Sequence, residues 1–88
     1  MFQVRWEESA VNRLATLWNE ADVSGRARIT GSTARLDIKL ANDPFGDSES
    51  RGGSRRIRFE PPLGVIYRIE ADGITVSVTH VWRFERRS

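Results

Sequence analysis

The stretch RGGSRRIRFEPPLGVIY, residues 51–67, contains a glycine-rich basic loop, a short strand, a diproline turn and the start of a second strand. Successive side chains of a strand point to opposite faces, so Arg56 and Arg58 share one face of the first strand. Ile57 and Phe59 share the other face. We therefore predict one face that packs on a core and one cationic face suited to binding phosphate.

The composition predicts a small water-soluble protein. The chain has 88 residues, of which 39% are hydrophobic and 30% are charged. This length suits one domain, residues 1–88, with one modest core, and no apolar run is long enough to span a membrane. The absence of cysteine excludes disulfides and thiolate metal sites. The first predicted strand begins at residue 2 and leaves no room for a leader peptide, so we expect a cytoplasmic protein.

The net charge of +2 conceals an asymmetry between the two halves of the chain. Residues 1–50 carry six basic and eight acidic side chains, whereas residues 51–88 carry eight arginines and four acidic side chains. The C-terminal half is therefore cationic. Such a surface favours nucleic acid or an acidic protein as partner, and a solvated basic surface is the alternative.

The N-terminal residues predict a strand followed by a helix. Alternation of apolar and polar residues over 2–6 predicts a strand with one buried face. From Glu8 to about Asp22 the apolar residues recur at helical spacing, and acidic side chains suit the start of a helix. The apolar stripe of this helix is formed by Val11, Leu14, Leu17, Trp18 and Ala21. We expect this stripe to be core rather than a binding face, because so short a chain needs every such stripe.

A second helix is predicted over about residues 24–42. Its apolar side would be formed by Ile29, Thr33, Leu36 and Leu40. Gly31 and Ser32 interrupt the pattern, and a mid-helix glycine costs about 1 kcal/mol relative to alanine, so the helix should bend there or begin later. Pro44 ends the helix because it disfavours helical geometry at the preceding residue. Residues 43–54 are polar and aperiodic and are predicted to form a loop.

Three strands are predicted after this loop, over residues 55–59, 65–70 and 74–82. Asp72 and Gly73 form the turn between the last two, because Asp-Gly supplies the positive φ of a hairpin turn. The order of elements predicts an α+β domain. Two helices would pack on one face of a four-stranded sheet, in which the last three strands form an antiparallel meander.

With these elements in place, the chain resembles the RelE/ParE superfamily of bacterial type II toxins over nearly all of its length. The resemblance rests on FQVRWEESAVNRLATLW, on LANDP at the end of the second helix, and on RRIRF, VIY and ITVSVTHVWR in the later strands. It implies the fold described above. It also implies a cognate antitoxin protein that occupies the surface of the toxin and blocks it.

The resemblance implies one of two activities. RelE-type members cut mRNA on the ribosome, whereas ParE-type members inhibit DNA gyrase and are not nucleases. Arg56 and Arg58 stand where the nucleases keep basic residues, and there they would hold RNA or assist proton transfer. The chain departs from the nucleases at Gly64, where they have an arginine. Its C-terminus also lacks the tyrosine or His-Tyr pair with which they tend to end.

His80 is the only histidine of the chain. Cleavage of RNA by its 2′-hydroxyl needs a base, an acid and a cation, and histidine is the side chain that titrates near neutral pH. Strand alternation nevertheless puts His80 on the face of Val76 and Val78, which predicts an inward, hydrogen-bonded histidine unless a bulge rotates it. Trp82 shares that face and is predicted to be core, with stacking on a base as the alternative.

The leading hypothesis is a ribosome-dependent mRNA endonuclease. Arg56 and Arg58 would hold the phosphate, Arg83 would assist, and His80 would act as general acid. Further RNA contacts are predicted for Arg51, Arg55, Arg86 and Arg87. A gyrase inhibitor and an inactive member that only binds its antitoxin are the alternatives. No metal or cofactor is predicted, because the chain has no cluster of ligating side chains.

Overall fold

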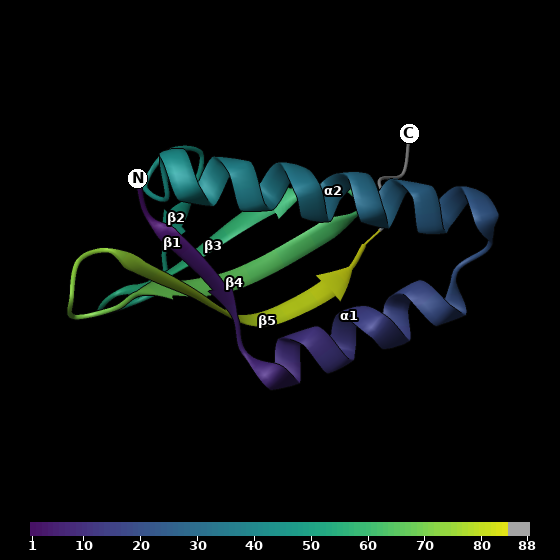
Figure 1. Cartoon of the computed structure of the whole chain (residues 1–88), viewed down its shortest axis with the longest axis horizontal. Helices are drawn as coiled ribbons and strands as arrows, with labels where there is room; N and C mark the ends of the chain where they lie inside the picture. Colours follow the sequence, from purple (N-terminus) through teal and green to yellow (C-terminus); the bar gives the residue numbers. More distant parts are fainter. Residues whose placement is uncertain (85–88) are drawn as a thin grey trace.

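The computed structural model describes residues 1–84 and contains two helices and five strands within them (Figure 1). The elements are β1 (Gln3–Trp6), α1 (Glu8–Glu20), α2 (Val23–Asn42), β2 (Glu49–Ser50), β3 (Arg55–Glu60), β4 (Leu63–Ile69) and β5 (Thr75–Arg83). The strands form one sheet in the order β1-β5-β4-β3-β2. β1 and β5 are parallel, and the other neighbours are antiparallel. The predicted α+β architecture is confirmed.

The sheet has five strands rather than the predicted four. The additional strand is β2, in which Glu49 pairs with Ile57 and Ser50 pairs with Arg56. It lies inside the segment 43–54 that the sequence predicts to be a loop. A strand of two residues is too short to show alternation, so hydrophobic periodicity gives no signal for it.

Both helices pack on the same face of the sheet, as predicted. α2 crosses this face, and α1, which begins directly after β1, packs along β5 (Figure 1). Strand alternation explains the arrangement, because apolar residues at every second position of β4 and at the start of β5 point to the helices. The shared core is formed by Ala10, Leu17, Ala21, Ile29, Leu36, Leu40, Leu63, Val65, Tyr67, Val76, Val78 and Val81.

α2 begins at Val23, earlier than Gly31 and Ser32 suggest. Asp22 caps its start, because the side chain accepts a hydrogen bond from the backbone N–H of Gly25 at 2.7 Å. Ser32 lies inside the helix and is fully buried. Its hydroxyl donates to the carbonyl oxygen of Pro61 at 2.7 Å, so this residue fastens the helix to the turn after β3. Within residues 1–84, no helix is both long and apolar enough to cross a membrane.

The apolar stripe of α1 is only partly core, which corrects the prediction. Leu17 and Ala21 are buried, but Val11 is 48% exposed and Trp18 is 41% exposed. α2 lies beside α1 instead of over it (Figure 1), so the outer part of the stripe remains uncovered. Periodicity identifies the apolar side of a helix but does not reveal how much of that side a neighbour covers.

A β-bulge in β5 reverses the orientation of the residues that follow it. Ile66 pairs with His80 and Tyr67 pairs with Val78, so Thr79 has no partner on β4. Val78 therefore faces the helices, whereas His80 points away from them and is exposed. The prediction of an inward His80 is wrong for this reason.

Candidate functional site

The residues predicted to act together lie on opposite faces of the sheet. Directly paired residues share a face, and Arg56, Arg58 and Arg83 pair with the buried residues of β4 that contact the helices. His80 pairs with Ile66 on the other face, which we call the open face. The open face is formed by Arg55, Ile57, Phe59, Gly64, Ile66, Arg68, His80 and Trp82. The proposed general acid and the proposed phosphate-binding arginines are thus separated by the sheet.

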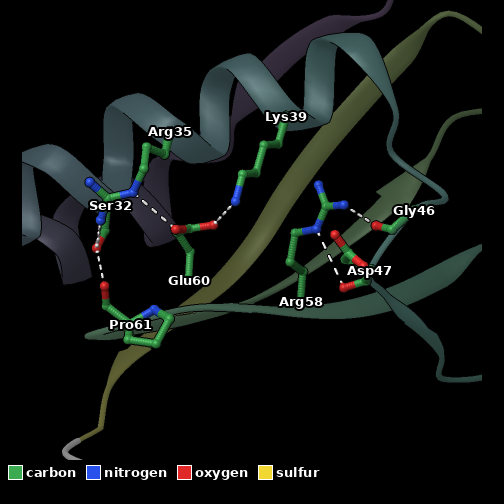
Figure 2. A network of polar contacts seen from close by, with 8 residues as sticks. All are labelled: Ser32, Arg35, Lys39, Gly46, Asp47, Arg58, Glu60 and Pro61. Atoms are coloured by element: carbon green, nitrogen blue, oxygen red, sulfur yellow. Dashed lines mark hydrogen bonds and ion pairs between the residues drawn. The ribbon is translucent and has the colours of Figure 1, made fainter.

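Arg58 is buried against a turn formed by residues 44–48, although the sequence predicts it to face solvent. It is only 4% exposed. Its Nη2 donates to the carbonyl oxygen of Gly46, and its Nε lies 3.5 Å from that of Asp47 (Figure 2). Among residues 1–84 it forms no ion pair with a carboxylate, and its Nη1 has no hydrogen-bond partner. In this conformation Arg58 holds the turn and is closed to a phosphate.

Arg56 and Tyr67 hold the same turn. The Nε of Arg56 donates to the hydroxyl of Ser48 at 2.7 Å, and its guanidinium lies 5.5 Å from the centre of the Phe45 ring. The buried hydroxyl of Tyr67 donates to the carbonyl oxygen of Pro44 at 2.5 Å. Arg56, Arg58 and Tyr67 on the helix-covered face therefore fix the segment after α2.

Glu60 forms a second polar network on the helix-covered face (Figure 2). Its carboxylate accepts hydrogen bonds from Arg35 Nε at 2.9 Å and from Lys39 Nζ at 2.7 Å. Burial alone would raise the pKa of Glu60, but the hydrogen bonds and charges of Lys39 and Arg35 outweigh it and lower the pKa below its ordinary value. This network joins α2 to the end of β3.

The open face contains a polar pocket with a volume of about 370 Å³. Its lining side chains are Glu7, Ser9, Arg55, Arg68, Thr79 and His80. Arg68 Nη2 lies 3.5 Å from the Glu7 carboxylate, and Arg68 Nε donates to Glu70. His80 Nδ1 lies 3.0 Å from the hydroxyl of Thr79. The pocket combines a titratable imidazole, a carboxylate and two guanidinium groups, which are the kinds of group that phosphodiester cleavage requires.

The sequence prediction identified part of this pocket. His80 and Arg55 are predicted from the sequence to contact the substrate and do line this pocket, whereas Glu7 and Arg68 are not among the predicted site residues. The pairing of Arg55 with Arg68 across β3 and β4 brings them together. No local pattern predicts that register before the sheet is known.

The other basic residues named from the sequence lie apart from the pocket. Arg51 is exposed before β3, with Nη2 3.7 Å from the Glu49 carboxylate. Arg83 lies beside the start of α2, where its Nη2 would be 3.1 Å from a Cβ atom added to Gly25. Arg86 and Arg87 lie outside the described residues.

The opposite end of the open face is aromatic. Phe59, Gly64 and Trp82 form one row across three strands. The Trp82 ring lies directly over Gly64, because a Cβ atom at this position would be 2.5 Å from two carbons of the indole. The rings of Phe59 and Trp82 meet edge to face at 6.0 Å, and those of Phe59 and Phe84 at 5.4 Å. Trp82 was predicted to be core, but it covers the open face.

An apolar groove with a volume of about 570 Å³ runs between α1 and α2. Its apolar lining includes Val11, Leu14 and Trp18 of α1 and Ile29 of α2. Arg26 lies 4.5 Å from the centre of the Trp18 ring at one end of the groove. On its α1 side the groove exposes the part of the apolar stripe that no other described element covers. An exposed apolar surface of this kind is typical of a protein-binding site.

No metal centre is found among residues 1–84, where no group of three His, Cys, Asp or Glu side chains is placed to hold an ion.

Comparison with solved structures finds several toxins of similar fold. A chain of the RelBE2 toxin–antitoxin complex from Mycobacterium tuberculosis is 19% identical, with a TM-score of 0.72 over 93% of this chain and 96% of that one. The YoeB/ParE toxin from Agrobacterium tumefaciens is 21% identical, with a TM-score of 0.70 over 97% and 100%. The isolated RelE toxin of E. coli is 15% identical, with a TM-score of 0.65 over 100% and 89%.

Comparisons of the sequence with protein-family models and with curated proteins give no match. The similarity to the solved structures shows that the chain has the fold of RelE/ParE toxins. Both RelE and ParE toxins are among the similar structures, so the fold alone does not distinguish their activities.

Proposed function

We propose that this chain is the toxin of a toxin–antitoxin pair and that it cleaves single-stranded RNA, with ribosome-bound mRNA as the substrate, in the polar pocket of the open face. The observation that carries the proposal is the bulge at Thr79, which turns His80 into the pocket that also contains Arg55, Arg68 and Glu7. This group differs from the set predicted from the sequence, because Arg56 and Arg58 point to the helix-covered face.

The groups in the pocket match the steps of cleavage by the 2′-hydroxyl. Glu7 would accept the proton of the 2′-hydroxyl as its oxygen bonds to phosphorus. His80 would give a proton to the 5′-oxygen as the bond between phosphorus and that oxygen breaks. The products are a 2′,3′-cyclic phosphate and a 5′-hydroxyl. Arg55 and Arg68 would stabilise the charge that develops on the phosphate oxygens.

Arg68 is suited to this role because its position is fixed. The Glu7 carboxylate contacts its Nη2 and the Glu70 carboxylate contacts its Nε. Arg55 is exposed, and among residues 1–84 it has no side-chain partner, so its guanidinium is available to a phosphate. Arg56 and Arg58 would then support the fold near the site without contacting the substrate.

The test compares the wild-type chain with a His80→Gln variant on programmed ribosomes and on free single-stranded RNA. We expect the variant to lose cleavage by a factor of about 100 or more, the usual contribution of a general acid. Arg28→Gln removes an exposed charge of α2 and serves as a control that should cleave normally. Undiminished cleavage by the His80→Gln variant would refute the proposed site.

A second candidate function is inhibition of DNA gyrase, and one observation favours it. The resemblance puts an arginine of the nucleases at the position of Gly64, and here the Trp82 ring fills the space that such a side chain would need. A chain that leaves RNA and programmed ribosomes intact but blocks DNA supercoiling by purified gyrase would support this second function.

A cognate antitoxin is the partner that we propose for the groove between α1 and α2. Several similar structures are toxin–antitoxin complexes. An amphipathic helix could place its apolar side chains against Val11, Leu14 and Trp18. This surface lies on the helical side of the molecule and away from the open face, so it leaves the proposed site available to a second part of the antitoxin.

A further inference from the structure

Phe59, at the aromatic end of the open face, is not part of the hydrophobic core. Phe59 is 51% exposed, although strand alternation predicts that it packs inward. The correction follows from the register, because Phe59 pairs with Gly64 on the face opposite the helices. An exposed aromatic ring held between other rings is unusual for packing alone and indicates a binding surface.

Gly64 allows the Trp82 ring to lie against the sheet. Because it has no side chain, the Trp82 ring can lie directly on the backbone of β4. Phe59 stands beside this ring, at an interplanar angle of 82°. The two rings come from β3 and β5, so the sheet itself fixes their spacing, and little side-chain freedom remains to be lost on binding.

The charge of the open face identifies the occupant. One strand step of two residues, about 7 Å, leads from the row of Phe59 to the row of His80, and one further step leads to Arg55 and Arg68. Aromatic rings beside guanidinium groups on one sheet face suit a single-stranded nucleic acid, whose bases stack and whose phosphates are anionic. A purely apolar protein segment would leave the neighbouring cations unused.

We infer that Phe59 and Trp82 form a stacking platform for an unpaired base next to the phosphate bound in the polar pocket. This inference rests on the proposed RNA cleavage and names its substrate as unpaired RNA. A base on the platform would position the neighbouring phosphate at His80. Double-stranded RNA would be excluded, because its bases are stacked on one another and do not reach the platform.

The test measures binding separately from cleavage. A fluorescent 2′-O-methyl hexauridylate has no free 2′-hydroxyl, so it binds without being cut, and a matched oligomer of the same length with abasic residues removes the bases alone. We expect Phe59→Leu to bind the hexauridylate about tenfold more weakly than wild type, in line with the loss of one stacked base. Phe59→Tyr keeps the ring and should bind like wild type.

Phe45→Leu is the matched control, because Phe45 is 54% exposed but lies in the turn after α2. It should bind the hexauridylate like wild type. The wild-type chain should also lose about tenfold in affinity for the abasic oligomer, whereas Phe59→Leu should not distinguish the two oligomers. Thermal unfolding of each variant confirms that it is folded.

Equal affinity of wild type, Phe59→Leu and Phe45→Leu would overturn the platform, as would a wild-type chain that ignores the removal of the bases. If Phe59→Leu instead weakens only the binding of the antitoxin, the rings serve a protein partner and the inference is wrong. Base-dependent binding without cleavage of unmodified RNA would uphold the platform and refute the proposed nuclease. If the Phe59→Leu variant instead cleaves unmodified RNA as well as wild type does, the platform is refuted and the proposed nuclease is upheld.

Discussion

The hydroxyl of Tyr67 donates a hydrogen bond to the carbonyl oxygen of Pro44 at 2.5 Å, and this contact joins the centre of β4 to the turn that follows α2. Tyr67 is completely buried. Its ring belongs to the core while its hydroxyl satisfies a backbone group that water cannot reach. The only tyrosine of the chain is therefore explained by structure, without a catalytic role.

Tyr67→Phe should lower the free energy of unfolding by about 1–3 kcal/mol, because it removes the short hydrogen bond of the buried Pro44 carbonyl and leaves only the longer one from the Ser48 hydroxyl, at 3.5 Å. Urea denaturation followed by fluorescence measures this change. Thr16→Val is the control, because the Thr16 hydroxyl bonds the Asn12 carbonyl at an exposed position, and its loss should cost less than about 0.5 kcal/mol. A Tyr67→Phe variant as stable as wild type would show that the hydrogen bond contributes nothing.

Arg58→Met should leave the free energy of unfolding unchanged or raise it by about 1 kcal/mol. The substitution removes a buried charge that has no carboxylate partner among residues 1–84 and keeps the apolar volume. We expect this gain to offset the loss of the hydrogen bonds to the carbonyls of Gly46 and Asp47. Arg58→Ala should instead lower stability by about 2–4 kcal/mol, because it also opens a cavity. Urea denaturation of both variants measures the contrast.

The same Arg58→Met variant separates the two versions of the catalytic site. If the open face carries the chemistry, the variant should cleave RNA within about threefold of wild type. A loss of 100-fold or more in a folded Arg58→Met protein, the effect expected for a charge-stabilising group, would return Arg58 to the catalytic set predicted from the sequence.

Glu60→Gln should destabilise the protein near neutral pH and lose this effect in acid. The folded protein lowers the pKa of Glu60, so its carboxylate contributes stability above the unfolded pKa, and that contribution disappears as the pH falls through the lowered folded pKa. We expect a difference of about 1 kcal/mol, because Arg35 and Lys39 are both about half exposed, at 51% and 47%. Denaturation at a series of pH values measures it.

Glu49→Gln provides the control for this experiment. Glu49 contacts Arg51 at 3.7 Å, but its side chain is 74% exposed, so its substitution should change stability little at any pH. A Glu60→Gln variant whose deficit persists unchanged into strong acid would show that the loss comes from packing and not from the charge.

Much of the fold follows from patterns that are local in the sequence. The helical spacing of α1 and α2, the Asp-Gly turn and the alternation in β3 and β4 each depend on a few neighbouring residues. The strand β2 was not predicted, because two residues are too few to show the alternation of a strand. The bulge at Thr79 was not predicted because alternation looks continuous through it, although a single extra residue turns His80 from the core to the open face.

The candidate site was harder to predict because it depends on contacts between distant segments. Arg58 is buried and donates hydrogen bonds to the carbonyl groups of residues 46 and 47. The sequence of its own strand does not predict these contacts. Arg68 joins the pocket only through the register of β3 with β4 and through the position of Glu7 at the start of α1. Residue type led to the hypothesis of phosphate chemistry, which stays a prediction. The pairing of the strands determines which arginines lie on the same face as His80.

Val11→Asp tests whether the groove between α1 and α2 binds the antitoxin. Val11 is 48% exposed and lines the groove, so the substitution should leave the fold intact and place a charge where the partner would bury an apolar side chain. We expect the affinity for the cognate antitoxin to fall by at least about tenfold, in line with the cost of burying an unpaired charge. Titration calorimetry with the purified antitoxin measures it. Val23→Asp is the matched control, because Val23 is 84% exposed and does not line the groove. Equal affinities of the two variants would place the antitoxin elsewhere on the toxin.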